Sequence, residues 1–203
     1  RVMLPMISNV SEVEEALHLI YRVYHEVREE GADITMPRVG VMIEVPASVY
    51  QVKALAERVD FLSVGSNDLT QYLLAVDRNN PRVASLYHTY HPAVLQALKR
   101  IVDDAHAVGK PVSICGELAG DPGGAVLLMA MGYDALSMNA SNLPKVKSVL
   151  RSITRDWAQA LLADVMAQDS PHVVRSSVEL ALRSKGLGRY MRPERSTTDA
   201  SAA

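Results

Sequence analysis

With 203 residues, 48% of them hydrophobic and 22% charged, the chain has the composition of an ordinary globular protein with room for one substantial core. A formal net charge of −2 leaves no electrostatic footprint for nucleic acid or an anionic membrane, and no apolar run reaches the ~18 residues of a membrane-spanning helix. The single cysteine, Cys115, excludes an intrachain disulfide, which predicts a reducing, cytoplasmic setting and a free thiol.

Strand and helix patterns alternate along residues 1–153, which predicts a parallel sheet with crossover helices. The expected strands cover residues 2–7, 39–43, 60–65, 111–115 and 134–138. The expected helices cover residues 12–30, 46–58, 69–75, 92–108 and 122–131, with a further helix from Pro144 onward. Ser11, with Glu14 three residues later, is the expected N-cap of the first helix. The segments VDFLSVG and YDALSMN echo each other, each with an acidic residue entering an apolar strand.

Beyond Arg151 the pattern changes, because two helical stretches, residues 157–167 and 171–184, follow with no strand between them. We expect residues 154–186 to form C-terminal helices that pack on the rest of the fold, and residues 187–203 to form a flexible tail. Apolar side chains on the first of these helices either cover the fold or offer a partner surface. They are Trp157, Leu161, Leu162, Val165 and Met166.

The number of βα units limits the possible architecture. A closed eight-stranded βα barrel takes ~250 residues. The chain is therefore either an open α/β sheet or the C-terminal part, about five βα units, of a (β/α)8 TIM-type barrel. Arg1 leads at once into a strand pattern, so we expect a piece of a longer protein, which favours the partial barrel. Such a piece leaves the strand edge at residues 2–7 without a partner.

Polar side chains follow the ends of the expected strands. Glu44 follows the second strand, and Asn67 and Asp68 follow the third. The carboxyl ends of parallel strands gather on one face, where active sites form. Two carboxylates with room for water and a phosphate suit Mg²⁺. The alternative is that these carboxylates cap helices or pair with an arginine.

Arg78 and Cys115 add a cation and a thiol to the same set. Arg78, ten residues after Asp68, is able to hold a phosphate or carboxylate bidentately, although a solvated turn arginine is the more common case. Cys115, followed by Gly116 and Glu117, is a candidate for proton transfer or nucleophilic attack rather than inert packing. Phosphoryl transfer with Mg²⁺, together with a thiol acid that protonates a carbanion or enol, uses every member of the set.

Several segments of the chain resemble the C-terminal phosphoenolpyruvate-binding barrel of enzyme I, the phosphoenolpyruvate–protein phosphotransferase of the bacterial phosphotransferase system. These segments are VMLPMIS, GVMIEVPAS, VDFLSVGSNDLTQYLLAVDRNN, ICGELAGDP and ALSMNASNLPKVK. Pyruvate phosphate dikinases and phosphoenolpyruvate synthases, of the same phosphoenolpyruvate/pyruvate superfamily, share the barrel, but CGELAGDP is similar to enzyme I. The tail SKGLGRYMRPE resembles the nitrogen-related branch of that family.

The resemblance implies a role for each candidate residue. Glu44 and Asp68 match the family's Mg²⁺ ligands. Asn67 matches a residue that contacts phosphoenolpyruvate, and Arg78 matches an arginine on the substrate phosphate. Cys115 matches the acid that protonates C3 of the enolate as pyruvate forms. The phosphoryl group passes to a histidine on a separate domain, and from there to a histidine-containing phosphocarrier protein.

The same resemblance implies what the chain lacks. The phosphorylated histidine and three early barrel strands, which carry further substrate arginines in the family, have no counterpart here. We therefore expect this chain to be inactive alone and its parent to be a homodimeric enzyme. Two alternatives stay open, namely a dikinase- or synthase-like enzyme and a non-catalytic dimerisation fragment.

Overall fold

Five parallel strands form the centre of the fold. The computed structural model describes residues 1–191; residues 192–203, where most of the expected tail lies, fall outside the described part. The strands are β1 (Val2–Leu4), β2 (Val39–Ile43), β3 (Phe61–Gly65), β4 (Val112–Cys115) and β5 (Ala135–Leu136). Each strand pairs in parallel with the next, in the order β1-β2-β3-β4-β5. This consecutive order is the winding of a βα barrel, whereas a doubly wound sheet reverses its order at a switch point.

The central strands are mostly apolar because parallel strands are covered on both faces. In β2 and β3 the side chains of Val41, Ile43, Leu62 and Val64 have no exposed surface. The outer strands are shorter than expected, since the first ends at Leu4 rather than at residue 7. Within the described residues, β1 and β5 each pair with a strand on one side only, so the sheet stays open.

Two aspartates that precede strands join neighbouring strands at their amino ends. The Oδ2 atom of Asp60 accepts the backbone N–H of Val39 at 2.8 Å. The Oδ2 atom of Asp134 accepts the backbone N–H of Val112 at 2.8 Å, and His106 Nε2 lies 2.9 Å from the same oxygen. The echo between the two strand segments in the sequence therefore reflects one structural device used twice.

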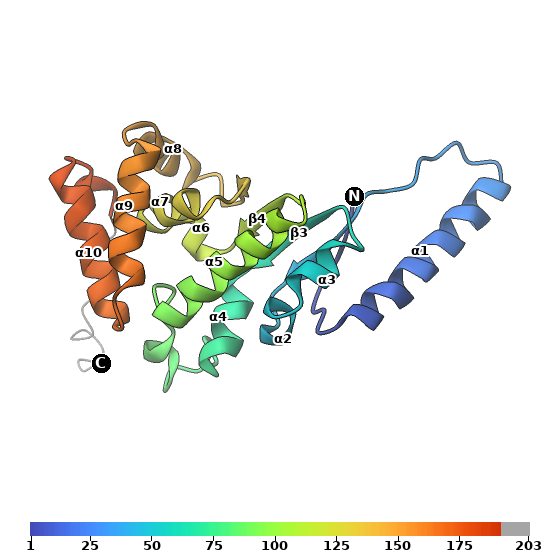
Figure 1. Ribbon diagram of the computed structural model, residues 1–203, viewed down its shortest axis with the longest axis horizontal. Coiled ribbons are helices and arrows are strands. Elements are labelled where there is room, and N and C mark those ends of the chain that lie inside the picture. The colour runs from blue at the N-terminus through green and yellow to red at the C-terminus, as the bar shows by residue number, and fades with distance from the viewer. Residues whose placement is uncertain (192–203) are drawn as a thin grey trace.

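Helices connect the strands and continue beyond them. They are α1 (Val10–Glu29), α2 (Pro46–Val49), α3 (Val52–Ala56), α4 (Ser66–Leu74), α5 (Pro92–Ala107), α6 (Glu117–Gly120), α7 (Pro122–Met131), α8 (Leu143–Arg151), α9 (Arg155–Met166) and α10 (Pro171–Ser184). Short 3₁₀ helices cover Ala84–Leu86 and Gly188–Tyr190. Figure 1 shows α1 at one end of the molecule and α9 with α10 at the other. None of the described helices is long and apolar enough to cross a membrane.

The expected N-cap of the first helix is wrong. Asn9 caps α1, because its Oδ1 accepts the N–H of Glu12 at 3.2 Å while Glu12 Oε2 accepts the N–H of Asn9 at 3.1 Å. The sequence holds two capping-box patterns of the same spacing, and Glu12 also accepts the N–H of Ser8 at 2.7 Å. These extra bonds favour the earlier start, and Ser11 donates its hydroxyl to Asn9 Oδ1 instead.

The expected single helix over residues 46–58 is also wrong, because it is divided into α2 and α3. Gln51 lies at the division with φ −118°, outside the helical range, and its Nε2 donates to the carbonyl of Ser8 at 2.8 Å. This contact ties the division to the loop after β1. Helix α4 begins at Ser66, one turn earlier than residue 69.

The C-terminal helices cover α7, which is apolar on all sides and almost wholly buried. On α9, Leu161, Leu162 and Val165 are buried, so this stripe covers the fold and is not a free partner surface. The start of the expected tail also packs, since Leu187 is buried and the Tyr190 hydroxyl lies 2.9 Å from that of Ser148.

Candidate functional site

The carboxyl ends of three neighbouring strands bring Glu44, Gly65 and Cys115 into one row. In the sheet register Ile43 lies beside Val64, and Gly65 lies beside Cys115. A Cβ atom at Gly65 would lie 2.6 Å from Glu44 Oε2, so the carboxylate occupies the space over the end of β3. Glycine at this position is therefore what admits the Glu44 side chain.

Glu44 is a buried carboxylate with only 4% of its surface exposed. Its Oε1 accepts the N–H of Met6 at 2.7 Å. Met6 has φ +55°, a left-handed conformation that is uncommon for a residue other than glycine. No lysine, arginine or histidine of residues 1–191 forms an ion pair with Glu44. Burying a carboxylate without a cation is costly, so the free Oε2 suits a metal ion.

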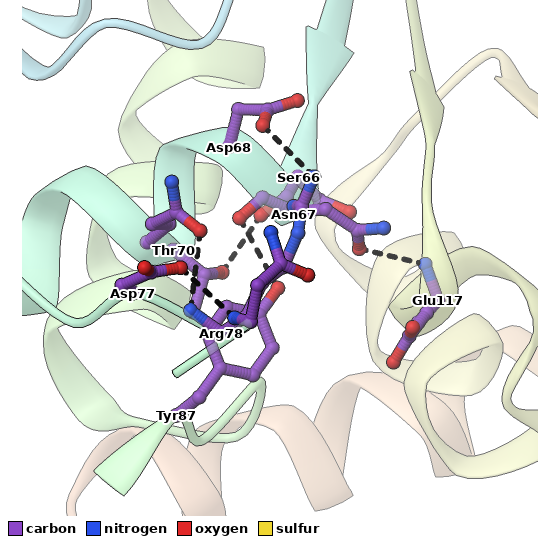
Figure 2. Close-up of polar contacts among 10 residues, drawn as sticks. Ser66, Asn67, Asp68, Thr70, Asp77, Arg78, Tyr87 and Glu117 are labelled. Carbon is purple, nitrogen blue, oxygen red and sulfur yellow. Dashed lines mark hydrogen bonds and ion pairs between the residues drawn. The ribbon is translucent and has the colours of Figure 1, made fainter. Parts of the chain in front are cut away.

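The first turn of α4 and the loop after it form the charged part of the site (Figure 2). Asp68 Oδ1 lies 3.1 Å from Arg78 Nη2. The other terminal nitrogen of Arg78, Nη1, is buried and has no hydrogen-bond partner. A buried guanidinium N–H without an acceptor is unfavourable, and an anion placed there would satisfy it. The expected pairing of a carboxylate with an arginine is thus present alongside an unfilled donor.

Tyr87 joins this part of the site, although no pattern in the sequence pointed to it. Its hydroxyl donates to the backbone carbonyl of Asn67 at 3.1 Å (Figure 2) and also contacts the Arg78 guanidinium. Burial raises the pKa of Tyr87, so the phenol stays protonated and remains a donor. The tyrosine lies in an irregular loop, and only the folded chain brings it to the end of β3.

Cys115 is a half-buried free thiol at the end of β4. Its Sγ lies 3.5 Å from the carbonyl oxygen of Val64 and donates to it. Burial raises the pKa of the Cys115 thiol, and the negative charges of Glu44 and Asp68 raise it further. The thiol therefore keeps its proton at neutral pH, which suits an acid rather than a nucleophile.

A polar cavity of about 700 Å³ lies beside the ends of β3 and β4. Asn67, Cys115 and Glu117 line its strand-end side. Glu44, Asp68 and Arg78 are not part of its lining, so the charged group and the cavity meet at Asn67 and Cys115. The far side of the cavity is formed by residues that include Ser137, Asn139, Asn142, Lys145 and Arg175.

The structure connects all of the residues that the sequence singled out. Asp68 pairs with Arg78, the charges of Glu44 and Asp68 act on the Cys115 thiol, and Asn67 borders the same cavity as Cys115. In the described part of the chain, no cluster of three or more histidine, cysteine or acidic side chains is arranged to hold a metal ion. Two carboxylates still fit Mg²⁺, which is commonly held by one or two carboxylates together with substrate phosphates.

Comparison with known proteins identifies the family of this chain. Residues 1–155 match the family described as PEP-utilising enzyme, PEP-binding domain, where PEP is phosphoenolpyruvate. The chain belongs to this family.

The curated relatives of this chain include two proteins named phosphoenolpyruvate-dependent phosphotransferase system. The one from Salmonella typhimurium is 45% identical and the one from Escherichia coli 44% identical, each over 94% of the chain and 26% of its own length. A phosphoenolpyruvate-protein phosphotransferase of Haemophilus influenzae is 45% identical over 82% of the chain and 29% of its own length. The chain thus spans about a quarter of the length of these relatives.

A solved structure confirms the fold class. A citrate lyase from Burkholderia xenovorans superposes with a TM-score of 0.52 at 20% identity, over 95% of this chain and 65% of the other. At this identity the similarity concerns the fold alone. The expected α/β architecture, with parallel strands in barrel order and two C-terminal helices, is confirmed.

Proposed function

We propose that this chain is the phosphoenolpyruvate-binding part of a phosphoenolpyruvate–protein phosphotransferase, enzyme I of the phosphotransferase system. The observation that carries the proposal is the row at the strand ends, where a buried carboxylate without a counter-ion stands beside a protonated thiol. Membership in a family described as PEP-binding favours phosphoenolpyruvate as the substrate. The names of the relatives favour a phosphotransferase over a dikinase or synthase.

Glu44 and Asp68 are the proposed ligands of Mg²⁺. Glu44 is prepared for this role, because Met6 fixes Oε1 and leaves Oε2 free. When bound, the ion would offset negative charge on the phosphoryl oxygens. Arg78 offers its unpartnered Nη1 to the phosphate, and Asn67 contacts the substrate from the side of the cavity.

The proposed reaction moves one phosphoryl group and one proton. The bond between phosphorus and the enolate oxygen breaks as a bond forms between phosphorus and a histidine nitrogen on a separate domain. The enolate left behind takes the thiol proton of Cys115 at C3, which gives pyruvate. The thiolate then regains a proton from solvent. A raised pKa at Cys115 keeps the proton on sulfur until the enolate, a stronger base, has formed.

Several finer assignments belong to the same proposal. The phosphorylated domain would pass its phosphoryl group to a histidine-containing phosphocarrier protein in the cytoplasm. The parent protein would be a homodimer, and the sequence of the tail favours the nitrogen-related branch. A dimer through the α9 stripe is disfavoured, because those side chains pack on α7 within the chain.

The acid role of Cys115 is tested by Cys115→Ala in the longer enzyme that carries this chain. We expect binding of phosphoenolpyruvate to be retained while turnover falls by about 10²-fold or more, the usual contribution of a positioned acid. Ser113→Ala, on the same strand, is the control and should leave turnover unchanged. Steady-state pyruvate formation measures both variants. Unchanged turnover in Cys115→Ala would exclude the acid role.

A further inference from the structure

Side chains from the first turn of α4 hold the turn that follows β4. The hydroxyl of Ser66 donates to the backbone carbonyl of Cys115 at 2.6 Å. The next residue, Asn67, accepts the backbone N–H of Glu117 through Oδ1 at 3.0 Å, a bond visible in Figure 2. Ser66 is 3% exposed, so its hydrogen bond is shielded from water. The main chain on both sides of Gly116 is thus fixed from α4.

Gly116 is shaped to receive these contacts. Its φ is +110°, a conformation that favours glycine. A Cβ atom at Gly116 would lie 2.3 Å from Ser66 Oγ and 2.8 Å from Asn67 Oδ1. Any side chain at Gly116 would therefore collide with the two atoms that hold the turn. The Ser66 hydroxyl occupies the space that the absence of a side chain at Gly116 leaves free, and we call this packing the matched contact.

We propose that Ser66 is a positioning residue for Cys115, an inference that rests on the acid role proposed above. Ser66 fixes the carbonyl of Cys115, while the thiol donates to Val64 at the end of the adjacent strand. With the carbonyl of Cys115 held from α4 and its thiol bonded to β3, the position of the Sγ atom relative to the carboxylates is restricted. Loss of the hydroxyl frees the turn and lets the thiol reorient.

The same geometry defines what Asn67 offers a substrate. Its Oδ1 is occupied by the N–H of Glu117, which leaves the two N–H groups of Nδ2. Asn67 therefore acts on the substrate as a donor, which suits a phosphate or carboxylate oxygen.

The first test uses Cys115 as the only cysteine of the chain. Alkylation by iodoacetamide, followed by mass spectrometry, reports the accessibility and the ionisation of this one thiol, both of which depend on where the Sγ atom lies. Ser66→Ala should raise the alkylation rate about fivefold, the factor that corresponds to loss of about 1 kcal/mol from one buried hydrogen bond. Ser48→Ala is the matched control, because Ser48 is equally buried and donates to the Val45 carbonyl at 2.6 Å. It should leave the rate unchanged.

A double-mutant cycle tests the matched contact itself. Gly116→Ala should raise the alkylation rate strongly in the wild-type background. In the Ser66→Ala background its effect should be at least about twofold smaller, because the nearest colliding atom is gone. Independent, multiplicative effects of the two substitutions would overturn the inference. So would equal rates in Ser66→Ala and the wild type, or an equal rise in Ser48→Ala.

A third readout separates positioning from a purely structural role. In the longer enzyme, Ser66→Ala should lower kcat about tenfold and leave the KM for phosphoenolpyruvate unchanged, because it displaces the acid and not the substrate ligands. A rise in KM with kcat unchanged would contradict this role. The alkylation assay needs neither substrate nor Mg²⁺, so its failure would reject the positioning role and leave the proposed function standing.

Discussion

The thiol of Cys115 shares its surroundings with the carboxylates of Glu44 and Asp68, and this environment selects its chemistry. From the sequence, proton transfer and nucleophilic attack were both open. Burial and the two negative charges raise the thiol pKa, whereas a nucleophilic cysteine needs a lowered one. We infer that the site stores a proton at sulfur. The carboxylates thus serve two purposes, since they are the proposed metal ligands and they keep the thiol protonated.

Asp134 gives a residue-scale prediction for stability against pH. Burial raises the pKa of Asp134, but hydrogen bonds from His106 and from the backbone of Val112 outweigh it, so the net pKa is lowered. A lowered folded-state pKa means that the carboxylate stabilises the fold above its ordinary pKa. This contribution is lost as the pH falls through the folded-state value.

We therefore expect Asp134→Asn to lower the free energy of unfolding at neutral pH by about 0.5–1 kcal/mol, a figure reduced because the side chain is partly exposed. In acid the difference from the wild type should vanish. Urea unfolding at both pH values measures it. Asp103→Asn, which removes an exposed carboxylate paired with Lys99 on α5, serves as a control for loss of a surface ion pair. A difference that is the same in acid and at neutral pH would contradict the assignment.

The residues of the candidate site differ in how readily the sequence predicts their position. Glu44 and Cys115 stand at the ends of apolar runs, so the strand pattern alone places them on one face. Tyr87 and the N–H of Met6 reach the site from irregular loops, where no periodic pattern marks position. Their contacts depend on how the chain folds back, which local sequence does not encode.

At the scale of elements, the capping box of α1 provides a direct test. Asn9→Ala should lower the free energy of unfolding by about 1 kcal/mol, because it leaves the N–H of Glu12 without its acceptor. Ser11→Ala should cost less, since Ser11 bonds only to the Asn9 side chain. Urea unfolding of the two variants compares them. A larger loss in Ser11→Ala would restore the later start of the helix.

The errors of the sequence-based prediction lie mainly at the boundaries of helices. Periodicity continues through residues 46–58, yet a side-chain bond from Gln51 to another loop divides that helix. Helix α6 has four residues, too few to show a helical period. In contrast, α10 was predicted with its observed bounds, because Pro171 opens it and an apolar stripe runs through it.

At the scale of the whole molecule, the alternation of strands and helices was enough to predict a parallel sheet, but it left an open α/β sheet and a partial barrel both possible. The consecutive strand order of the structure is what favours the barrel. The burial of α7 was not foreseen, because its cover comes from α9, which lies beyond the last strand. The sheet is open at β1 and β5 in the described residues, and the chain spans about a quarter of the length of the relatives. The candidate residues at the strand ends nevertheless come together within this one segment.

Calorimetric titration of phosphoenolpyruvate into this chain, with and without Mg²⁺, tests the account most directly. We predict binding that requires Mg²⁺ and disappears in Asp68→Ala. Binding should persist in Asp77→Ala, whose carboxylate lies near Arg78 in sequence and caps a turn through the N–H of Asn79. A folded chain that binds without Mg²⁺, or that binds equally well after Asp68→Ala, would contradict the proposed site.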